Sequence, residues 1–283
     1  MPHLTLITPT YNSAKTLSDT IESILEQIRN YPTLADNLDY IIMDGGSTDK
    51  TIEIVQRYQN TNNLNIKLIS EPDKGIYDAM NKAILLAIKT ETNATSTTKG
   101  ANNDIVGIIN SDDFYHDPMV LQKVIETFES DPMIDAVYGD LMYVQNDDIT
   151  KQTRYWQAGE YKEENLNWGW SIPHPTFFLR KRIYQKLIEQ NNSGEIFNTK
   201  LSLAADVELI FRLLKIYKIK VKYIPEILVT MRNNGTSANS LKQRIKGWRE
   251  QRMVWKVNQF PVPLFFITRR LAHKIWQFIK LHR

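Results

Sequence analysis

The sequence IVGIINSDD, residues 105–113, joins an apolar run directly to two adjacent aspartates. A short apolar run rich in β-branched residues is typical of a buried strand, whose end would place the acidic groups beside a surface crevice. Adjacent carboxylates repel each other unless a cation or hydrogen-bond donors lie between them and a ligand. Oxygen-only ligands suit Mg²⁺ or Mn²⁺ shared with substrate phosphates. The alternative is an Asp-rich turn that caps the next helix.

Strand and helix patterns alternate on both sides of this stretch. The predicted strands are residues 4–8, 39–43, 64–69, 105–109 and 135–140, and the predicted helices are residues 15–29, 49–58, 76–89, 118–128, 181–190 and 205–217. Strands separated by helices favour right-handed crossovers and a mainly parallel, Rossmann-like α/β sheet flanked by helices. The sequences TPTYN (8–12), DGGS (44–47) and NSDD (110–113) then all lie at the edge where such sheets bind ligands.

The composition is that of a globular protein, with 42% hydrophobic and 24% charged residues among 283. The chain has no cysteine, which excludes disulfides and thiolate metal sites and favours a reducing compartment. We expect no secretory signal, because the N-terminus has no basic leader before a long apolar stretch. We also expect no transmembrane helix, because no apolar run approaches about 18 residues. These features predict a cytoplasmic protein.

The last part of the chain is strongly basic. Residues 241–283 contain 11 Lys/Arg and one acidic residue, whereas the other residues have a net charge of −7. The end of this tail predicts an amphipathic helix with the apolar residues Leu264, Ile267, Leu271, Ile275, Phe278 and Ile279. Cations beside Trp and Phe favour a helix at the inner face of an anionic membrane. The alternative is a helix packed on its own domain or on a partner subunit, which leaves a homo-oligomer open. The apolar stripe argues against nucleic-acid binding.

The segment TPTYN has the composition of a nucleotide site. The hydroxyls of Thr8 and Thr10 and the ring of Tyr11 suit hydrogen bonding and stacking with a nucleobase. The alternative is that Asn12 or Ser13 caps the following helix.

The segment SEPDKGIYDAMNKAI, residues 70–84, is a second candidate. Asp73 and Lys74 fall in a turn before a helix, on which Asp78 and Asn81 occupy adjacent turns. A lysine beside a helix N-terminus suits a phosphate. The alternative is an ordinary turn with solvated charges.

Four segments in order, TPTYNSAKTLSDTIESILEQ, DYIIMDGGSTDKTIEIVQRY, EPDKGIYDAMNKAI and GIINSDD, resemble family 2 glycosyltransferases with the GT-A fold. The variant resembled occurs in bacterial surface-polysaccharide gene clusters. The resemblance covers about residues 3–235. It implies a nucleotide-sugar-binding half at residues 1–110 and a metal and acceptor half of the same domain at residues 111–240. Residues 241–283 then form the basic amphipathic tail.

The resemblance implies roles for individual residues. Asp112 would meet the ribose of the donor, and Asp113 would hold the Mn²⁺ or Mg²⁺ that bridges its diphosphate. The candidate donor site comprises Thr8, Pro9, Thr10, Tyr11, Asn12, Asp44, Asp73, Lys74, Asn81, Ser111 and Asp112.

The sequence departs from the family pattern in the donor half. The common Asp-Asp-Gly-Ser reads Asp44-Gly45-Gly46-Ser47, so the second aspartate, which reads the base, is missing. Asp73 is the candidate replacement. The metal motif reads Ser-Asp-Asp rather than Asp-x-Asp.

The second half supplies a candidate base in LSLAADVELIFRLL. By resemblance to the family's Glu-Asp-x-x-Leu segment, Asp206 takes the proton of the acceptor hydroxyl as that hydroxyl attacks the anomeric carbon with inversion. The family's preceding Glu is Ala205 here, and Glu208 follows on the same helix as an acceptor-side candidate. The alternative for Asp206 is helix capping.

Three further residues are acceptor-side or loop candidates. His174 lies between prolines, where the family has a similar His near its acceptor site, although a lone His is more often structural. Trp168 and Trp170 suit a sugar-stacking platform or a buried core. Arg232, just before the sequence NGTS (234–237), lies where family members close a loop over the diphosphate.

These observations predict a metal-dependent inverting glycosyltransferase. It would move a sugar from a nucleotide diphosphate donor, in the first place a UDP-sugar, to a hydroxyl of a lipid-linked or glycan acceptor in cell-surface polysaccharide synthesis. The alternatives are a nucleotidyltransferase on a related α/β fold and a catalytically inactive module that only binds.

Overall fold

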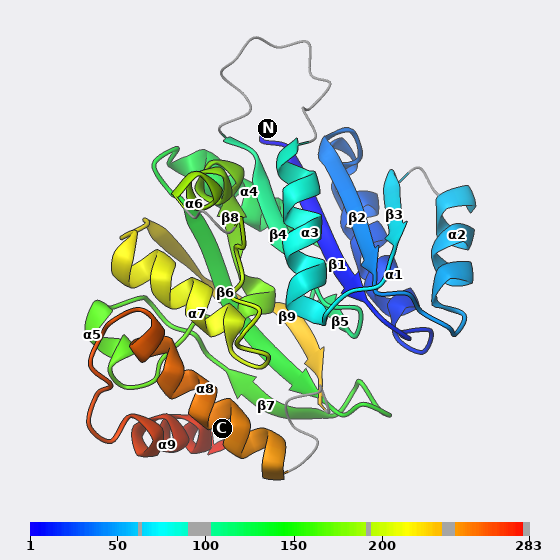
Figure 1. Cartoon of the computed structure of the whole chain (residues 1–283). Coiled ribbons are helices and arrows are strands. Elements are labelled where there is room, and N and C mark those ends of the chain that lie inside the picture. Colours follow the sequence, from blue (N-terminus) through cyan, green and yellow to red (C-terminus); the bar gives the residue numbers. More distant parts are fainter. Residues whose placement is uncertain (62–63, 90–102, 191–193, 234–240, 280–283) are drawn as a thin grey trace.

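The computed structural model describes residues 1–61, 64–89, 103–190, 194–233 and 241–279 (Figure 1). In these residues nine strands form one sheet, with helices on both faces. The strands are β1 (Leu4–Thr10), β2 (Leu38–Asp44), β3 (Ile66–Ser70), β4 (Ile105–Ile108), β5 (Asp113–Tyr115), β6 (Ala136–Val144), β7 (Gln152–Trp156), β8 (Phe178–Arg180) and β9 (Val221–Arg232).

The helices alternate with these strands through the first half of the chain, as the sequence predicts. They are α1 (Leu17–Asn30), α2 (Thr51–Thr61), α3 (Ile76–Lys89), α4 (Val120–Ser130), α5 (Glu163–Leu166), α6 (Lys181–Gln190), α7 (Ala205–Phe211), α8 (Leu241–Val257) and α9 (Phe266–Ile279), with short 3₁₀ turns η1 (Pro32–Asn37) and η3 (His174–Thr176). The predicted helix 205–217 is divided, because α7 is followed by the wider π-helical turn η4 (Arg212–Ile216).

The sheet is mixed and mostly parallel. Its strand order is β3-β2-β1-β4-β8-β6-β9-β5, and β7 pairs with β6. The pairings make β1, β2, β3, β4, β6 and β9 run in one direction, whereas β5, β7 and β8 are antiparallel to their neighbours. The prediction of a mainly parallel sheet is therefore confirmed. The three short antiparallel strands are too brief to leave a periodic pattern in the sequence.

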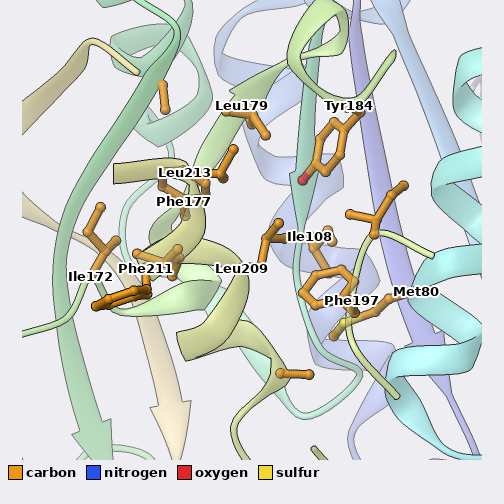
Figure 2. Packing of buried hydrophobic residues seen from close by; sticks show 14 of the residues in the cluster. Met80, Ile108, Ile172, Phe177, Leu179, Tyr184, Phe197, Leu209, Phe211 and Leu213 are labelled. Carbon is orange, nitrogen blue, oxygen red and sulfur yellow. The ribbon is translucent and has the colours of Figure 1, made fainter. Parts of the chain in front are cut away.

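Each face of the sheet buries its own apolar cluster, because successive strand residues point to opposite faces. On β1, Ile7 belongs to one cluster and Leu6 to the other. The larger cluster packs α3, α6 and α7 on one face, where Met80, Phe197 and Leu209 surround Ile108 (Figure 2). This cluster fixes α7 relative to the parallel strands.

The C-terminal helices pack on this larger cluster (Figure 1). The Trp255 ring of α8 lies 4.7 Å from Phe211 and 6.0 Å from Phe266 of α9, measured between ring centroids. Ile267, predicted to face a membrane, is partly buried against the same cluster, and this part of the prediction is wrong. Leu264 is 79% exposed, as predicted. In the part of the chain that the structure describes, no helix is both long and apolar enough to cross a bilayer.

Candidate active site

The three polar sequences that follow strands meet at one edge of the sheet, as predicted. Thr10 pairs with Asp44 across β1 and β2, and Ile7 pairs with Ile108 across β1 and β4. The loops that follow these parallel strands therefore leave the sheet side by side. Ser111 joins two of them, because its Oγ lies 2.8 Å from the Oγ of Ser13 in the first loop.

The loop after β1 exposes Tyr11 and uses Asn12 to hold its shape. Asn12 has a left-handed backbone, with φ of 50°, which asparagine tolerates better than most residues. Its Oδ1 accepts a hydrogen bond from Thr48 N at 2.9 Å, and its own N–H donates to Ser47 Oγ at 2.8 Å. Tyr11 remains 61% exposed. The Tyr11 ring is therefore accessible to a ligand, whereas the Asn12 amide joins two loops.

The preceding residues of β1 are buried, which corrects part of the predicted donor site. Thr8 is fully buried, and its Oγ1 accepts a hydrogen bond from Tyr40 OH at 2.9 Å. Pro9 is also buried. The side chains of Thr8 and Pro9 are therefore part of the core and do not face a ligand. Thr10 differs, because its buried Oγ1 has no hydrogen-bond partner within the described residues.

Asp44 organises the loop after β2. Its fully buried carboxylate accepts hydrogen bonds from the N–H groups of Gly46 at 3.0 Å and Ser47 at 2.9 Å, and from Ser70 Oγ at 2.7 Å. Direct contact of Asp44 with a nucleotide was predicted, and the structure instead assigns its oxygens to the protein. The buried charge is stabilised because several donors converge on it.

Asp73 occupies the space beside Gly45. A Cβ placed on Gly45 would overlap the Asp73 carboxylate, at 3.0 Å from its Cγ. The carboxylate is held there by Gly75 N, which donates to Asp73 Oδ1 at 2.7 Å. The acid group of Asp73 therefore lies where a side chain on residue 45 would project.

Lys74 and Asn81, the other two residues that the sequence predicted in this segment, differ in their exposure. Lys74 is exposed at the start of α3, where a phosphate could reach it. Asn81 is buried, and its side-chain amide is hydrogen-bonded to the backbone of Ile196 and Phe197. Asn81 Nδ2 donates to Phe197 O at 3.0 Å, and Asn81 Oδ1 accepts from Phe197 N at 2.8 Å and Ile196 N at 3.1 Å. The prediction that Asn81 contacts the donor is wrong, because its polar atoms are satisfied internally.

Asp113 is a buried carboxylate with an unused oxygen. It is fully buried at the start of β5, and its Oδ2 accepts a hydrogen bond from Asn110 Nδ2 at 2.9 Å. Its Oδ1 has no partner within the described residues. Burial, and then the neighbouring Asp112, raise the pKa of Asp113 well above its usual value. Burial also raises the pKa of the partly buried Asp112. The Asn110 amide and the positive charge of Arg232 lower the pKa of Asp113 and so offset this rise only in part.

This orphaned oxygen fits a divalent cation. The described residues contain no group of three or more His, Cys, Asp or Glu side chains arranged to hold a metal. Mg²⁺ is commonly bound through one or two carboxylates together with substrate phosphates, so one buried carboxylate suffices. The structure therefore fits a cation that is completed by the substrate, with Asp113 as its protein ligand.

Arg232 holds the backbone of Asp112 in place. It is 4% exposed at the end of β9, and its Nη1 donates to the backbone oxygen of Asp112 at 2.8 Å. Its Nη2 forms an ion pair with Asp19. The prediction placed Arg232 in a loop over the diphosphate, and the structure instead uses its guanidinium to position Asp112. The sequence NGTS (234–237) lies outside the described residues.

Asp206 lies in the first turn of α7 and faces α3. Tyr77 OH donates a hydrogen bond to Asp206 Oδ1 at 2.9 Å. Burial and the Asp206 charge raise the pKa of Tyr77 well above its usual value, so the phenol stays protonated and donates. The alternative role in helix capping is supported in part: the N-cap position is Ala204 and no side chain bonds there, but Asp206 lies in the first turn of α7, where a carboxylate interacts favourably with the helix dipole. The partly buried Asp206 carboxylate keeps its Oδ2 for a further proton.

His174 accompanies Asp206 without a direct bond to it. The imidazole packs edge-on against Phe197, with ring centroids 5.6 Å apart, and Tyr77 stacks on the same ring at 5.6 Å. Burial lowers the pKa of His174, and the nearby Asp206 charge opposes this shift. The structure thus brings His174 to Asp206, as the acceptor-side prediction requires.

Two other acceptor-side predictions are wrong. Glu208 is 3% exposed and forms an ion pair with Arg212 at 3.0 Å, while Asn258 of α8 donates to its Oε1 at 3.1 Å. Trp170 is 7% exposed, and its Nε1 donates to Ala158 O at 2.6 Å. Both side chains therefore hold the fold together. Trp168 is the exposed tryptophan of this segment, at 54%.

The structure adds three residues that the sequence did not indicate. Arg154 of β7 lies opposite Tyr143 of β6, with its Cζ 4.4 Å from the centre of the Tyr143 ring. Arg270 of α9 donates to Gly169 O at 2.6 Å. The charges of Asp113, Asp206, Arg154 and Arg270 all act on the pKa of Tyr143, which burial raises. Tyr143 is therefore within electrostatic reach of both Asp113 and Asp206. No motif could have revealed this, because the groups come from four distant elements.

The chain is similar to known proteins in sequence and in fold. A glycosyltransferase of Mycobacterium bovis described as "PGL/p-HBAD biosynthesis glycosyltransferase" is 28% identical over 185 residues, which cover 65% of this chain and 61% of that protein. The chain thus spans about three-fifths of the length of that relative. The S. aureus TarS 1-349 structure in complex with UDP matches 95% of this chain and 72% of its own, with a TM-score of 0.61 and 16% identity.

A second solved structure shares the fold. The mannosyltransferase PcManGT from Pyrobaculum calidifontis, in complex with GDP-Man and Mn²⁺, has a TM-score of 0.61 and 19% identity, and covers 98% of this chain and 70% of its own. The α/β architecture with a mostly parallel sheet is therefore that of known glycosyltransferase structures. The family model "Glycosyl transferase family 2" matches residues 5–188, nearly two-thirds of the chain. On this match, and on an edge of the sheet that carries the aspartates of the resemblance, the chain belongs to glycosyl transferase family 2.

Proposed function

We propose that the protein transfers a sugar from a nucleotide diphosphate donor to an acceptor hydroxyl, with inversion. One observation carries the proposal. The charges of Asp113, which has an oxygen without a hydrogen-bond partner in the described residues, and of Asp206, which is bonded to Tyr77, both act on the pKa of Tyr143, and this supports a single site. A metal-linked diphosphate and a proton-accepting carboxylate are the two charges that such a displacement requires.

On the donor side, the edge of β1, β2 and β4 binds the nucleotide. Tyr11 stacks on the base, and Asp112 accepts hydrogen bonds from the ribose hydroxyls. Asp73 reads the base in place of the aspartate missing at Gly45, because its carboxylate occupies the corresponding space. A carboxylate there accepts from a ring N–H, the imide N3–H of uracil or the lactam N1–H of guanine. Relatives in fold are seen with UDP and with GDP-Man, so a UDP-sugar is our first choice and a GDP-sugar the second.

Asp113 is the residue that would hold Mn²⁺ or Mg²⁺. When bound, the cation supplies positive charge to the departing diphosphate. The unused Asp113 Oδ1 supports this role, and Lys74 at the start of α3 offers a second cation near the donor side.

Asp206 acts as the general base. Tyr77 holds the carboxylate through Oδ1, which leaves Oδ2 to take the proton of the acceptor hydroxyl. The acceptor oxygen then bonds to the anomeric carbon as the bond from that carbon to the diphosphate breaks, on the opposite face. His174, whose pKa is lowered by burial, is a neutral neighbour that orients the acceptor.

We propose a lipid-linked or glycan acceptor of surface polysaccharide synthesis, reached at an anionic membrane. One exposed face of α8 supports this location. It carries, at helical spacing, Lys242, Ile245, Lys246, Arg249, Arg252, Met253, Lys256 and Val257. Leu264 and Phe265 follow, at 79% and 70% exposure. Cations interspersed with exposed apolar side chains favour a helix at the surface of a bilayer.

The decisive experiment measures UDP-, GDP- and dTDP-sugar hydrolysis and thermal shift with Mn²⁺. One nucleotide class should stabilise the protein and be hydrolysed only with the metal. Nucleoside triphosphates form the control arm, because a nucleotidyltransferase would release pyrophosphate from them. Stabilisation by no nucleotide diphosphate would overturn the proposal, and binding without turnover on any acceptor would favour the inactive module.

A further inference from the structure

Helix α9 brings Arg270 against Gly169 and within electrostatic reach of Asp206. Arg270 Nη1 donates to Gly169 O at 2.6 Å. A Cβ on Gly169 would lie 2.7 Å from Arg270 Cβ, and the φ of Gly169 is +77°, so only glycine permits this approach. The Asp206 charge also acts on the pKa of Arg270, which burial lowers to about 10. The C-terminal helix thus holds a cation beside Gly169 on which the charge of Asp206 acts.

A second guanidinium lies beside the first. Arg154 of β7 stands opposite Tyr143 of β6, and its Cζ lies 4.4 Å from the Tyr143 ring and 5.3 Å from the Trp156 ring. Helix α9 packs against β7. The Arg154 charge lowers the pKa of Arg270, so Arg270 lies within electrostatic reach of a second cation. The fold therefore holds two positive groups together in a partly buried place.

The Arg270 guanidinium has unused binding capacity. Within the described residues it makes one hydrogen bond and no ion pair, although a guanidinium carries five N–H donors. Asp206, the carboxylate that acts on it, is bonded to Tyr77. Two cations that are partly withdrawn from water repel each other unless an anion joins them. A planar guanidinium fork matches a phosphate or a carboxylate.

We propose that Arg270, together with Arg154, binds an anionic group of the acceptor, a phosphate, diphosphate or carboxylate beside the hydroxyl that receives the sugar. The inference rests on the proposed function, because it takes Asp206 as the group that meets this hydroxyl. The acceptor is favoured over the donor diphosphate because Arg270 approaches from α9 and Gly169, on the Asp206 side. Asp206 is the charge that acts most strongly on the pKa of Arg270.

The test compares acidic probes with neutral ones of the same shape, on full-length protein. Farnesyl diphosphate and farnesol represent a lipid-linked acceptor, and methyl β-glucuronide and methyl β-glucoside represent an acidic or neutral glycan. Affinities are measured with and without UDP and Mn²⁺. We expect the acidic member of one pair to bind about tenfold or more tightly than its neutral member, the scale of a charge-assisted hydrogen bond. The pair that shows this preference identifies the source of the anion.

Variants then assign the preference to Arg270. Arg270→Ala should remove it and Arg270→Lys should keep part of it, while UDP affinity changes by less than about twofold. Arg154→Gln changes strand β7 and leaves α9 intact. It should therefore weaken the same preference even if Arg270→Ala disturbs α9. Arg29→Ala, at the exposed end of α1, removes an equal charge and should leave the preference for the acidic probe unchanged.

Three results would overturn the inference: equal binding of acidic and neutral probes by the wild type, an unchanged preference in Arg270→Ala and Arg154→Gln, or a loss of UDP affinity in Arg270→Ala. The last result would indicate that Arg270 binds the donor diphosphate and not the acceptor. UDP binding to the wild type is measured separately. Its absence would contradict the proposed function, while the probe comparison without nucleotide would still report on the anion site.

Discussion

Tyr77 of α3 donates its hydroxyl hydrogen to Asp206 of α7 at 2.9 Å, which joins the two halves of the domain at the active site. Asn81 supports the contact one turn later on α3, because its amide bonds both N–H and C=O of Phe197. The Phe197 ring then stacks on Tyr77 and meets His174. The proposed base is thus held by α3, a helix whose sequence had suggested only a nucleotide contact.

Asp206→Asn should lower the transfer rate by about 100-fold or more, because the amide cannot accept the acceptor proton. Donor affinity should stay within about twofold, since α7 stands on the acceptor side. Initial rates and UDP titrations check both values. Asp36→Asn, on an exposed turn, is the control of equal charge. A variant that binds donor poorly but turns over normally would place the base elsewhere.

Tyr77→Phe should lower the transfer rate by about tenfold, since a hydrogen bond to a carboxylate contributes roughly 1.5–3 kcal/mol. The stacking on Phe197 is kept in this variant, so the melting temperature should change little. The measurement is kcat at saturating donor, compared with the melting temperature. An unchanged kcat would show that the Tyr77 hydroxyl does not hold the catalytic carboxylate.

Asp113→Asn should abolish metal-dependent donor binding and lower transfer by about 100-fold or more. The metal-free protein should not lose stability, because a neutral amide removes the cost of a buried charge whose pKa is raised by burial. Chelator should reproduce the loss of donor binding in the wild type. Thermal melts with and without UDP and Mn²⁺ measure both effects. Full transfer in excess chelator would contradict the metal assignment.

Asp73→Asn should weaken nucleotide affinity by about tenfold or more, as expected for the loss of a charged acceptor to a base N–H. Glu71→Gln, in the same exposed loop, is the control. A reciprocal exchange sharpens the test. Gly45→Asp alone should weaken binding, because its carboxylate would collide with Asp73, and Gly45→Asp with Asp73→Gly should restore it. Equal affinity in all variants, measured by calorimetry, would remove Asp73 from the base site.

Lys246→Glu, Arg249→Glu and Lys256→Glu together should release the protein from anionic vesicles. Each Lys/Arg near such a surface contributes about 1 kcal/mol, and salt should weaken binding of the wild type. Lys50→Glu, Lys67→Glu and Lys200→Glu, all exposed outside the tail, form the matched control. Sedimentation with anionic and neutral vesicles is the measurement. Point variants are required because truncation would remove Phe266, which packs on Trp255. Equal binding to anionic and neutral vesicles would contradict the membrane proposal.

The sequence by itself determined the sheet and the edge that carries the site. Alternating apolar runs set strands and helices, and parallel strands bring the loops after Thr10, Asp44 and Ile108 together whatever their side chains contact. Asp113 and Asp206 were candidates at this stage because the resemblance to the family assigned them roles, and those roles remain proposals. Periodicity was sufficient for the strands, the helices and the edge of the sheet.

Only the tertiary structure decided which polar side chains face a ligand. Thr8, Asp44, Asn81, Glu208 and Trp170 belong to suggestive motifs, yet their polar atoms bond within the protein. Arg270 belongs to no motif, yet Gly169 lets α9 bring it towards Asp206. A motif states what a side chain can bind, but a buried polar group must satisfy its nearest partners, and those partners come from distant parts of the chain.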